Sequence, residues 1–267
     1  MIDLHAHVLP GLDDGPASWE DAVALVQMAA ADGITAIVAT PHMMPDGGFV
    51  NPRQKVLPLV DELRERLAEL NIDVTIYPGG EVYMSPDLIA RYEQGDLLTY
   101  DDAGRYMLVE LPSSEVPAYA ERVVSDLHHM GITPIIAHPE RNTAISHKPQ
   151  LVQPLVEAGA LLQVNAGSLR SRHAARETAK YLITHGYVHF LATDCHGVYM
   201  RRPTLAKYVE MVRGWIGAEQ ADNLVRDNPT AVLNGEKLEP PRIQERQGLR
   251  ARLFGALRGT ARHDVRG

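Results

Sequence analysis

The sequence predicts an α/β protein, a distorted (β/α)7 TIM-like barrel with a metal site at the carboxyl ends of its strands, on three observations. Short β-branched apolar runs alternate with amphipathic segments of helical periodicity, as in parallel βα units. About seven such units precede residue 238. Nitrogen and oxygen ligands follow nearly every run, whereas an open sheet gathers its ligands at one switch point between two strands.

The expected strands are mainly apolar, β-branched runs, as strands buried on both faces are. We place them at residues 2–8, 34–40, 73–77, 106–111, 132–137, 160–166 and 187–193. The first expected helix, 18–31, has the capping pair Ser18 and Asp21, and the second, 52–70, follows the cap and proline of Asn51-Pro52. The later helices each stop near a glycine, at 117–130, 149–158, 173–185 and 203–216.

Composition limits the function classes. The 267 residues and 45% apolar content suit a globular domain with a full core, and the net charge of −8 argues against a primary nucleic-acid binder. A single cysteine, Cys195, excludes an intramolecular disulfide and indicates a reducing compartment. No run approaches the roughly 20 apolar residues of a membrane span, so we expect a cytoplasmic protein.

We expect one domain over residues 1–238 and a basic tail over 239–267, either disordered or helical. From Pro240 onward the tail carries seven arginines against Glu245 and Asp264, with apolar residues at helical spacing. An alternative is a basic amphipathic segment that contacts a membrane surface or an acidic partner.

Histidines and acids fall where the expected strands end. His5 and His7 share one face of the first strand, and Asp3 on that face is expected to orient a ligand imidazole. A bare Glu110 would be costly to bury in a barrel, and a cation removes that cost. Later runs end in the same way, at His42, Glu81, Glu110, His138, Asp194 and His196. Imidazoles and carboxylates without a thiolate set indicate a catalytic site for Mn, Fe or Zn.

These motifs resemble the PHP (polymerase and histidinol phosphatase) superfamily, and within it the manganese-dependent protein-tyrosine phosphatases of bacterial capsule and exopolysaccharide operons. The similarity runs from Met1 to about Glu236. Asp13-Asp14-Gly15 favours the tyrosine-phosphatase branch. The other marks are Ile2-Asp3-Leu4-His5-Ala6-His7, Thr40-Pro41-His42, Gly80-Glu81, Glu110-Leu111-Pro112, Ala137-His138-Pro139-Glu140-Arg141 and Thr193-Asp194-Cys195-His196.

The resemblance implies a PHP-type metallophosphatase domain with three Mn²⁺ ions, Fe or Zn being the alternatives. It implies that one ion is held by His5, His7, Glu81 and Asp194, that Glu81 bridges to a second held by Glu110 and His138, and that Asp14, His42 and His196 hold the third. Arg141 and Arg201 match the family's phosphate-contacting arginines. The implied partner is a phosphotyrosine protein, a bacterial tyrosine kinase of polysaccharide biosynthesis.

The expected reaction is attack of a metal-held hydroxide on a phosphomonoester. His42 is a candidate general acid. One alternative is a phosphatase of a small metabolite such as histidinol phosphate, and another is a non-enzymatic metal-binding regulatory module. A third is a cysteine-dependent phosphatase, because Cys195 and Arg201 have Cys-x5-Arg spacing, although strand alternation should turn Cys195 into the packing. Arg202 could replace its neighbour Arg201, and Arg141 could simply pair with Glu140 or Glu157.

Overall fold

The computed structural model describes residues 1–44, 48–170 and 174–238. Its strands are β1 (Ile2–Ala6), β2 (Ala36–Ala39), β3 (His42–Met43), β4 (Thr75–Pro78), β5 (Glu81–Tyr83), β6 (Tyr106–Glu110), β7 (Thr133–Ala137), β8 (Leu161–Asn165) and β9 (Phe190–Ala192). Its α-helices are α1 (Trp19–Ala31), α2 (Arg53–Glu69), α3 (Leu88–Glu93), α4 (Ala120–His129), α5 (Thr143–His147), α6 (Gln153–Glu157), α7 (Ala174–Thr184), α8 (Ala206–Ile216), α9 (Ala218–Asn223) and α10 (Asp227–Leu233).

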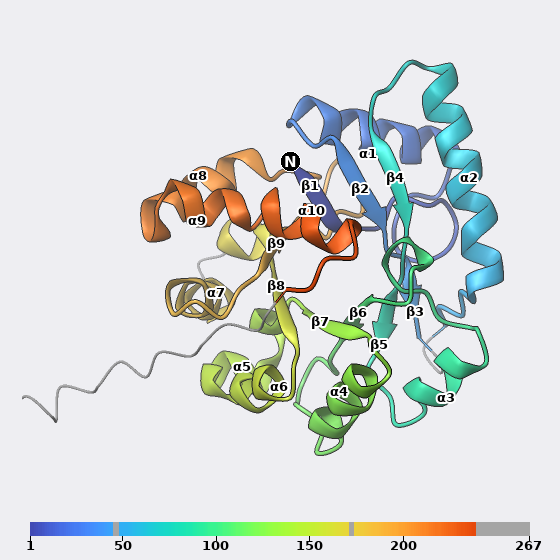
Figure 1. The fold of residues 1–267 in the computed structure, drawn as a ribbon. Helices are drawn as coiled ribbons and strands as arrows, with labels where there is room; N and C mark the ends of the chain where they lie inside the picture. The colour runs from blue at the N-terminus through green and yellow to red at the C-terminus, as the bar shows by residue number, and fades with distance from the viewer. Residues whose placement is uncertain (45–47, 171–173, 239–267) are drawn as a thin grey trace, which may run out of the picture.

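The strands close into a parallel barrel (Figure 1). One sheet has the order β1-β2-β4 and the other the order β3-β5-β6-β7-β8-β9. β2 continues into β3 and β4 into β5 after breaks of two residues, so the nine segments form seven strands. A bridge between Ala6 and Cys195, with the His7 amide donating to the Cys195 carbonyl at 2.9 Å, joins the last strand to the first. The predicted distorted (β/α)7 barrel is confirmed.

Glycine explains the break between β4 and β5. A Cβ atom on Gly79 would lie 2.7 Å from the Val38 side chain, closer than carbon atoms tolerate. The paired strands β2 and β4 can approach at this point only because Gly79 has no side chain. The break sets Glu81 at the start of the next segment, beside His42 in the register of β3 and β5.

The barrel interior is a packed layer beneath the site. Leu108 and Phe190 belong to an inner apolar cluster; Glu110 lies two residues beyond Leu108 on the same face of β6, and Asp194 follows the end of β9. In β1 the pairing with β2 shifts between Asp3 and Ala6. Such an irregularity re-aims side chains, and here Leu4 packs into the inner cluster while the adjacent His5 still reaches the site. The imidazoles and carboxylates of the site therefore lie beyond this layer, toward the carboxyl end of the barrel.

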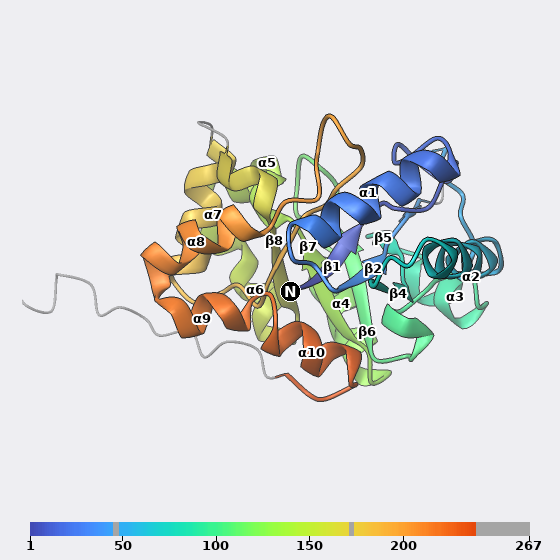
Figure 2. The same cartoon turned by 90° about the horizontal axis from the view of Figure 1, so that it is seen from above.

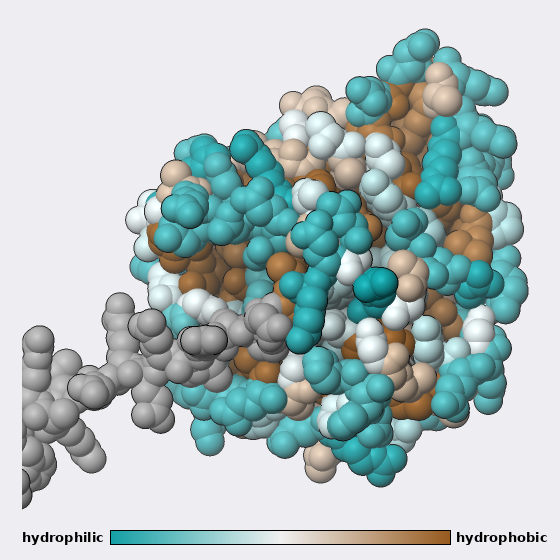
Figure 3. Space-filling model, in the orientation of Figure 1, coloured by the Kyte–Doolittle hydropathy of each residue, from teal (hydrophilic) through white to brown (hydrophobic). Residues whose placement is uncertain are grey.

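Helices surround the barrel, and α10 lies at the end opposite the loop that follows β9 (Figure 2). The face that carries α10 is largely hydrophilic, with hydrophobic side chains in separate patches (Figure 3). No helix in the described ranges is long and apolar enough to cross a membrane. The predicted basic tail, 239–267, lies outside the described residues.

The helices differ from prediction in detail. The Ser18 hydroxyl caps α1 by accepting from the Asp21 amide, as predicted. The predicted cap at Asn51 is wrong, because the Asn51 amide instead donates to the carbonyls of Leu12 and His42 at 2.8 and 2.9 Å. The segment predicted as one helix at 149–158 is a 3₁₀ turn followed by α6. The short helices α3, α5 and α9 were not predicted, since a few residues give no clear periodicity.

Candidate metal centre

Glu81 is the centre of the polar cluster at the carboxyl end of the barrel. Its Oε2 atom lies 3.2 Å from both His5 Nε2 and His7 Nε2 and 3.0 Å from His42 Nδ1. Its Oε1 atom lies 2.8 Å from His138 Nε2. Glu81 is completely buried, so four imidazoles from three other strands enclose a single carboxylate.

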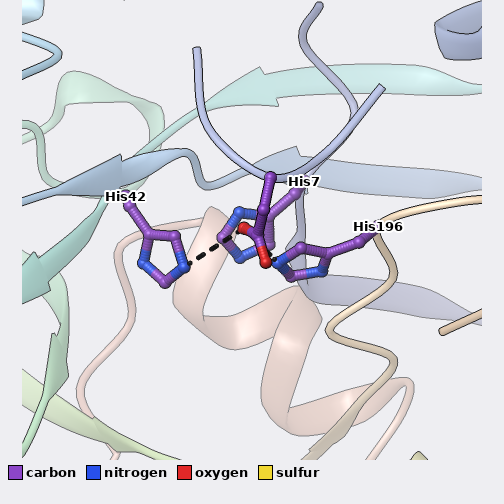
Figure 4. Close-up of side chains that lie close together, drawn as sticks. His7, His42 and His196 are labelled. Carbon is purple, nitrogen blue, oxygen red and sulfur yellow. Dashed lines mark ion pairs between the residues drawn. The ribbon is translucent and has the colours of Figure 1, made fainter. Parts of the chain in front are cut away.

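Three further carboxylates complete the cluster. Asp194 Oδ1 lies 3.5 and 3.6 Å from the Nε2 atoms of His5 and His7. Asp14 Oδ1 lies 3.1 Å from His196 Nε2. Glu110 is at the edge, with its oxygens 3.7 Å from His42 Nδ1 and 3.9 Å from His138 Nε2. The rings of His7, His42 and His196 face one another (Figure 4).

All nine side chains predicted as ligands therefore surround one volume. Seven of the nine form three overlapping groups, and within each group the donor atoms lie within 4.8 Å of one another. The groups are His7, Asp14, His42 and His196; His5, His7 and Glu81; and His42, Glu81 and Glu110. These groups differ from the ligand sets that the family resemblance implies. His7 also groups with Asp14, and His42 also groups with Glu81 and Glu110. Asp194 and His138 lie beside the groups and contact their members.

The donor atoms of this cluster fit cations. Among the described residues, His42 Nδ1, Glu81 Oε2 and His196 Nε2 are buried without a hydrogen-bond partner. Buried polar atoms are nearly always paired, and oxygen and imidazole lone pairs that face one another need positive charge between them. The site contains no thiolate, which matches metals that accept nitrogen and oxygen ligands.

The pKa shifts within the cluster also indicate that positive charge is favoured there. Burial lowers the pKa of the His7 imidazole, but Asp13 and Glu81 outweigh burial and raise it to about 10. In the same way Glu81 outweighs burial and raises the pKa of His138 to about 9. Burial and the charge on His7 lower the pKa of His196 to about 2. Burial and the Glu81 charge raise the pKa of Glu110, so each further anion here is unfavourable without a cation.

Two residues that orient the imidazoles were missed from the sequence. Asp13 Oδ2 lies 2.7 Å from His7 Nδ1 and also accepts from the His42 amide at 3.0 Å. Gln163 Oε1 lies 3.0 Å from His5 Nδ1. Such partners fix the tautomer of a ligand imidazole. An acid beside Asp14 and a glutamine inside the apolar run of β8 were the available signals.

The orienting role predicted for Asp3 is wrong. Its carboxylate accepts from the amide and hydroxyl of Thr193 and from the His5 amide, and it makes no contact with an imidazole ring. The irregular pairing of β1 separates Asp3 from the face that His5 uses. Asp3 instead joins β1 to β9, and burial raises the pKa of its carboxyl to about 6.

Both predicted arginines lie beside the cluster. Arg141 Nη1 and Arg201 Nη2 each donate to the Asp194 carboxylate at 2.6 Å, and Asn165 Nδ2 donates to it at 2.6 Å. Arg141 therefore pairs with Asp194 rather than with Glu140. Arg201, rather than its neighbour, faces the cluster, and its Nη1 atom lies 3.2 Å from Asp14.

The backbone around the site is strained. The φ angles of His138, Asp194 and Arg201 are 30°, 51° and 48°, values that residues other than glycine rarely adopt. Such strain persists where the surrounding structure over-determines it, and it clusters at functional sites. It turns three predicted site residues toward one mouth.

The cysteine mechanism does not fit the structure. Cys195 is completely buried in the apolar core, as strand alternation predicts. Burial raises the pKa of its thiol well above the usual range, so the nucleophilic thiolate is disfavoured.

The fold and the cluster define a class of protein: a closed βα barrel that presents imidazoles, carboxylates and two arginines at the carboxyl end of its strands, as barrel enzymes do. More particularly, the chain belongs to the CpsB/CapC family of capsular polysaccharide synthesis, whose model matches residues 1–234.

Its relatives are named as phosphatases. The chain is 32% identical to the tyrosine-protein phosphatase YwqE of Bacillus subtilis, over 96% of this chain and 99% of that protein. It is 29% identical to the tyrosine-protein phosphatase CpsB of Streptococcus pneumoniae, over 87% of this chain and 98% of that protein. A solved structure from work on YwqE and CpsB, described as metal-dependent tyrosine phosphatases, matches with a TM-score of 0.86 and 32% identity, over 91% of this chain and 98% of the other.

A more distant match indicates the fold alone. Histidinol phosphate phosphatase from Lactococcus lactis is 12% identical with a TM-score of 0.54, over 82% of this chain and 93% of that chain.

Proposed function

We propose that this protein is a metal-dependent tyrosine-protein phosphatase that hydrolyses phosphotyrosine on proteins. The observation that carries the proposal is the convergence of nine imidazole and carboxylate side chains on one volume with two arginines at its edge. The names of the relatives, which match over nearly their whole lengths, support the same activity.

The proposed cofactor is Mn²⁺, with three ions per chain, and Fe or Zn are the alternatives. Three overlapping donor groups support three ions, and donors limited to nitrogen and oxygen suit all three of these metals. The proposed ligands are His5, His7, Asp14, His42, Glu81, Glu110, His138, Asp194 and His196. Bound ions of this kind act as Lewis acids and supply a nucleophile from water at neutral pH.

The residues around the cluster bind and orient the ester. The guanidinium groups of Arg141 and Arg201 present forked donors that match phosphate oxygens, and they line the same cavity from the turn after β7 and from the loop after β9. The leaving phenolate of tyrosine has a pKa of about 10, so a weak proton donor suffices. The proposed proton donor is His42, 13% of whose side chain is exposed, and it would donate from the ring nitrogen that does not bind an ion.

The proposed substrate is a bacterial tyrosine kinase of polysaccharide biosynthesis. The description of the family as one of capsular polysaccharide synthesis supports this partner. A contact between the tail and a membrane surface or an acidic partner stays a prediction.

The test is metal-depleted protein resupplied with single metals and assayed on a phosphotyrosine peptide, the matched phosphoserine peptide and histidinol phosphate. We expect manganese to restore hydrolysis of the phosphotyrosine peptide most strongly. Faster hydrolysis of histidinol phosphate would replace the proposal with the small-metabolite alternative. Tight metal binding without hydrolysis of any substrate would indicate the regulatory module.

A further inference from the structure

A cavity of about 490 Å³ beside the metal centre has an unusual charge. It is lined by five cationic side chains and one carboxylate: Arg141, Arg170, Arg201, Arg202, Lys207 and Asp194. The chain as a whole is acidic, with 34 Asp and Glu against 26 Lys and Arg. An excess of cations in a concave site focuses the local field and favours anions there.

Two of these cations are already engaged, because Arg141 and Arg201 share the Asp194 carboxylate. The other three have no carboxylate partner within the described residues. Arg202 Nε donates to the Met28 sulfur at 3.3 Å, and Lys207 Nζ lies 4.8 Å from the centroid of the Tyr208 ring. These contacts position the side chains without neutralising them.

Several arginines elsewhere on the surface pair with carboxylates. Arg64 lies 2.9 Å from Asp61, and Arg66 lies 2.7 Å from Glu62, each within helix α2. The three unpaired cations come from separate segments: Arg170 ends the turn after β8, Arg202 lies in the loop after β9, and Lys207 is in the first turn of α8. Their convergence is therefore a product of the fold rather than of one basic run.

The cavity on the other side of the loop after β9 is lined by acidic rather than basic side chains, apart from Arg201. This second cavity of about 440 Å³ shares Tyr199, Met200 and Arg201 with the first, but its other charged linings are Asp14 and Asp21. Tyr199 and Met200 are 92% and 80% exposed and separate the two cavities. The mouth is thus electrostatically asymmetric, which favours a negative group on the α8 side only.

We propose that Arg170, Arg202 and Lys207 form a subsite for a second anionic side chain of the substrate protein, next to the phosphotyrosine. The inference rests on the proposed function, since the first anion is the ester phosphate at Arg141 and Arg201. Consecutive residues of an extended chain advance about 3.3 Å, so a group one or two residues from the phosphotyrosine stays within the same cavity. The second anion is the carboxylate of Asp or Glu or the phosphate of a second phosphotyrosine.

The test compares three phosphotyrosine peptides of equal length with flanking glutamines, flanking glutamates or a second phosphotyrosine. The wild-type full chain and the triple variant Arg170→Ala, Arg202→Ala, Lys207→Ala are both assayed. The matched control removes three arginines away from the mouth, by Arg64→Ala, Arg66→Ala and Arg122→Ala. We measure kcat/KM with manganese and, separately, peptide affinity by fluorescence anisotropy.

We expect wild type to prefer a charged peptide over the glutamine peptide by about fivefold, as exposed ion pairs of this number provide. The preference should shrink at high salt and vanish in the triple variant, while the control variant keeps it. Hydrolysis of the glutamine peptide and of 4-nitrophenyl phosphate should not change. The relative rates of the glutamate and doubly phosphorylated peptides identify the source of the anion.

Equal affinity of wild type for all three peptides, or a preference that survives in the triple variant, overturns the subsite. Absence of hydrolysis of every substrate by wild type overturns the proposed function instead, and the anisotropy data then decide the subsite independently.

Discussion

Replacing Asp13 by asparagine tests how His7 is held. Asp13 Oδ2 accepts from His7 Nδ1 at 2.7 Å and from the His42 amide at 3.0 Å, which keeps a proton on Nδ1 and makes Nε2, the nitrogen that faces Glu81, the one that gives up its proton to bind an ion. In Asp13→Asn the oxygen can still accept from the Gly15 amide, as Asp13 Oδ1 does at 2.9 Å. The new NH₂ group then faces His7 Nδ1 and the His42 amide, so the ring proton moves to Nε2, where it blocks a ligand position; in the opposite orientation the NH₂ group faces the Gly15 amide, and a donor again meets a donor.

Loss of such an orienting partner costs about 10- to 100-fold in metal affinity or activity. The assay titrates metal-depleted protein with Mn²⁺ and follows hydrolysis of 4-nitrophenyl phosphate, giving an apparent metal Kd and kcat. The matched control is Asp32→Asn, because Asp32 also accepts from two backbone amides, those of Leu205 and Ala206, away from the cluster. We expect this control to bind metal like wild type.

Wild-type metal affinity and kcat in Asp13→Asn would refute the argument that Asp13 sets the tautomer of His7. Equal losses in the Asp13 and Asp32 variants would also refute it, because the effect would then be a general loss of stability.

Three further predictions concern the thiol, the protons and the arginines. Cys195→Ser should keep its activity, because the thiol is buried and its pKa is raised. EDTA should abolish the activity of both wild type and Cys195→Ser. Loss of activity in Cys195→Ser that manganese does not restore would support the thiol mechanism. His7 and His138, with pKa values of about 10 and 9, hold protons in the metal-free protein at pH 7, so metal binding should release roughly two protons, counted by calorimetry in buffers of different ionisation enthalpy. Both pKa values exceed the usual 6.5, so the stability that these two groups give the metal-free protein is full below pH 6.5 and is lost as pH rises through about 9 to 10. A melting temperature of the metal-free protein that rises over this pH range would contradict the assignment. Arg201→Ala should lower kcat/KM for an aryl phosphate by about 100-fold, as loss of a charge-stabilising donor does, whereas Arg202→Ala should leave it unchanged. Equal losses in both variants would show that either arginine can fill the position.

The ligand candidates could be found from sequence because of a simple geometric rule. The carboxyl ends of parallel barrel strands meet at one rim, so a polar residue that ends an apolar run points to that rim. His42, Glu81 and Glu110 were found in this way, and the structure places them within one donor group. Their assignment as ligands is a proposal, but their proximity follows from the topology.

The residues that support the cluster could not be found by the same rule. Gln163 meets His5 across 158 residues of sequence, and Asp13 reaches the His42 amide across 29. Strict alternation misplaced Asp3, because it assumes a regular strand and β1 is irregular. Asn51 does not cap α2 because its side-chain amide donates to the carbonyls of Leu12 and His42, which are distant in the sequence.

The sequence alone determined the architecture and the chemical type of the site, because both depend on local periodicity and on residue types. Apolar runs separated by amphipathic helices leave few topologies besides a parallel barrel, and imidazoles with carboxylates indicate a site for metals that accept nitrogen and oxygen ligands. The tertiary structure alone decided which donor atoms share a position, which partner orients each ring and which cations stay unpaired at the mouth. Those features depend on distances of a few ångströms between strands far apart in the chain, and only the closure of the barrel sets such distances.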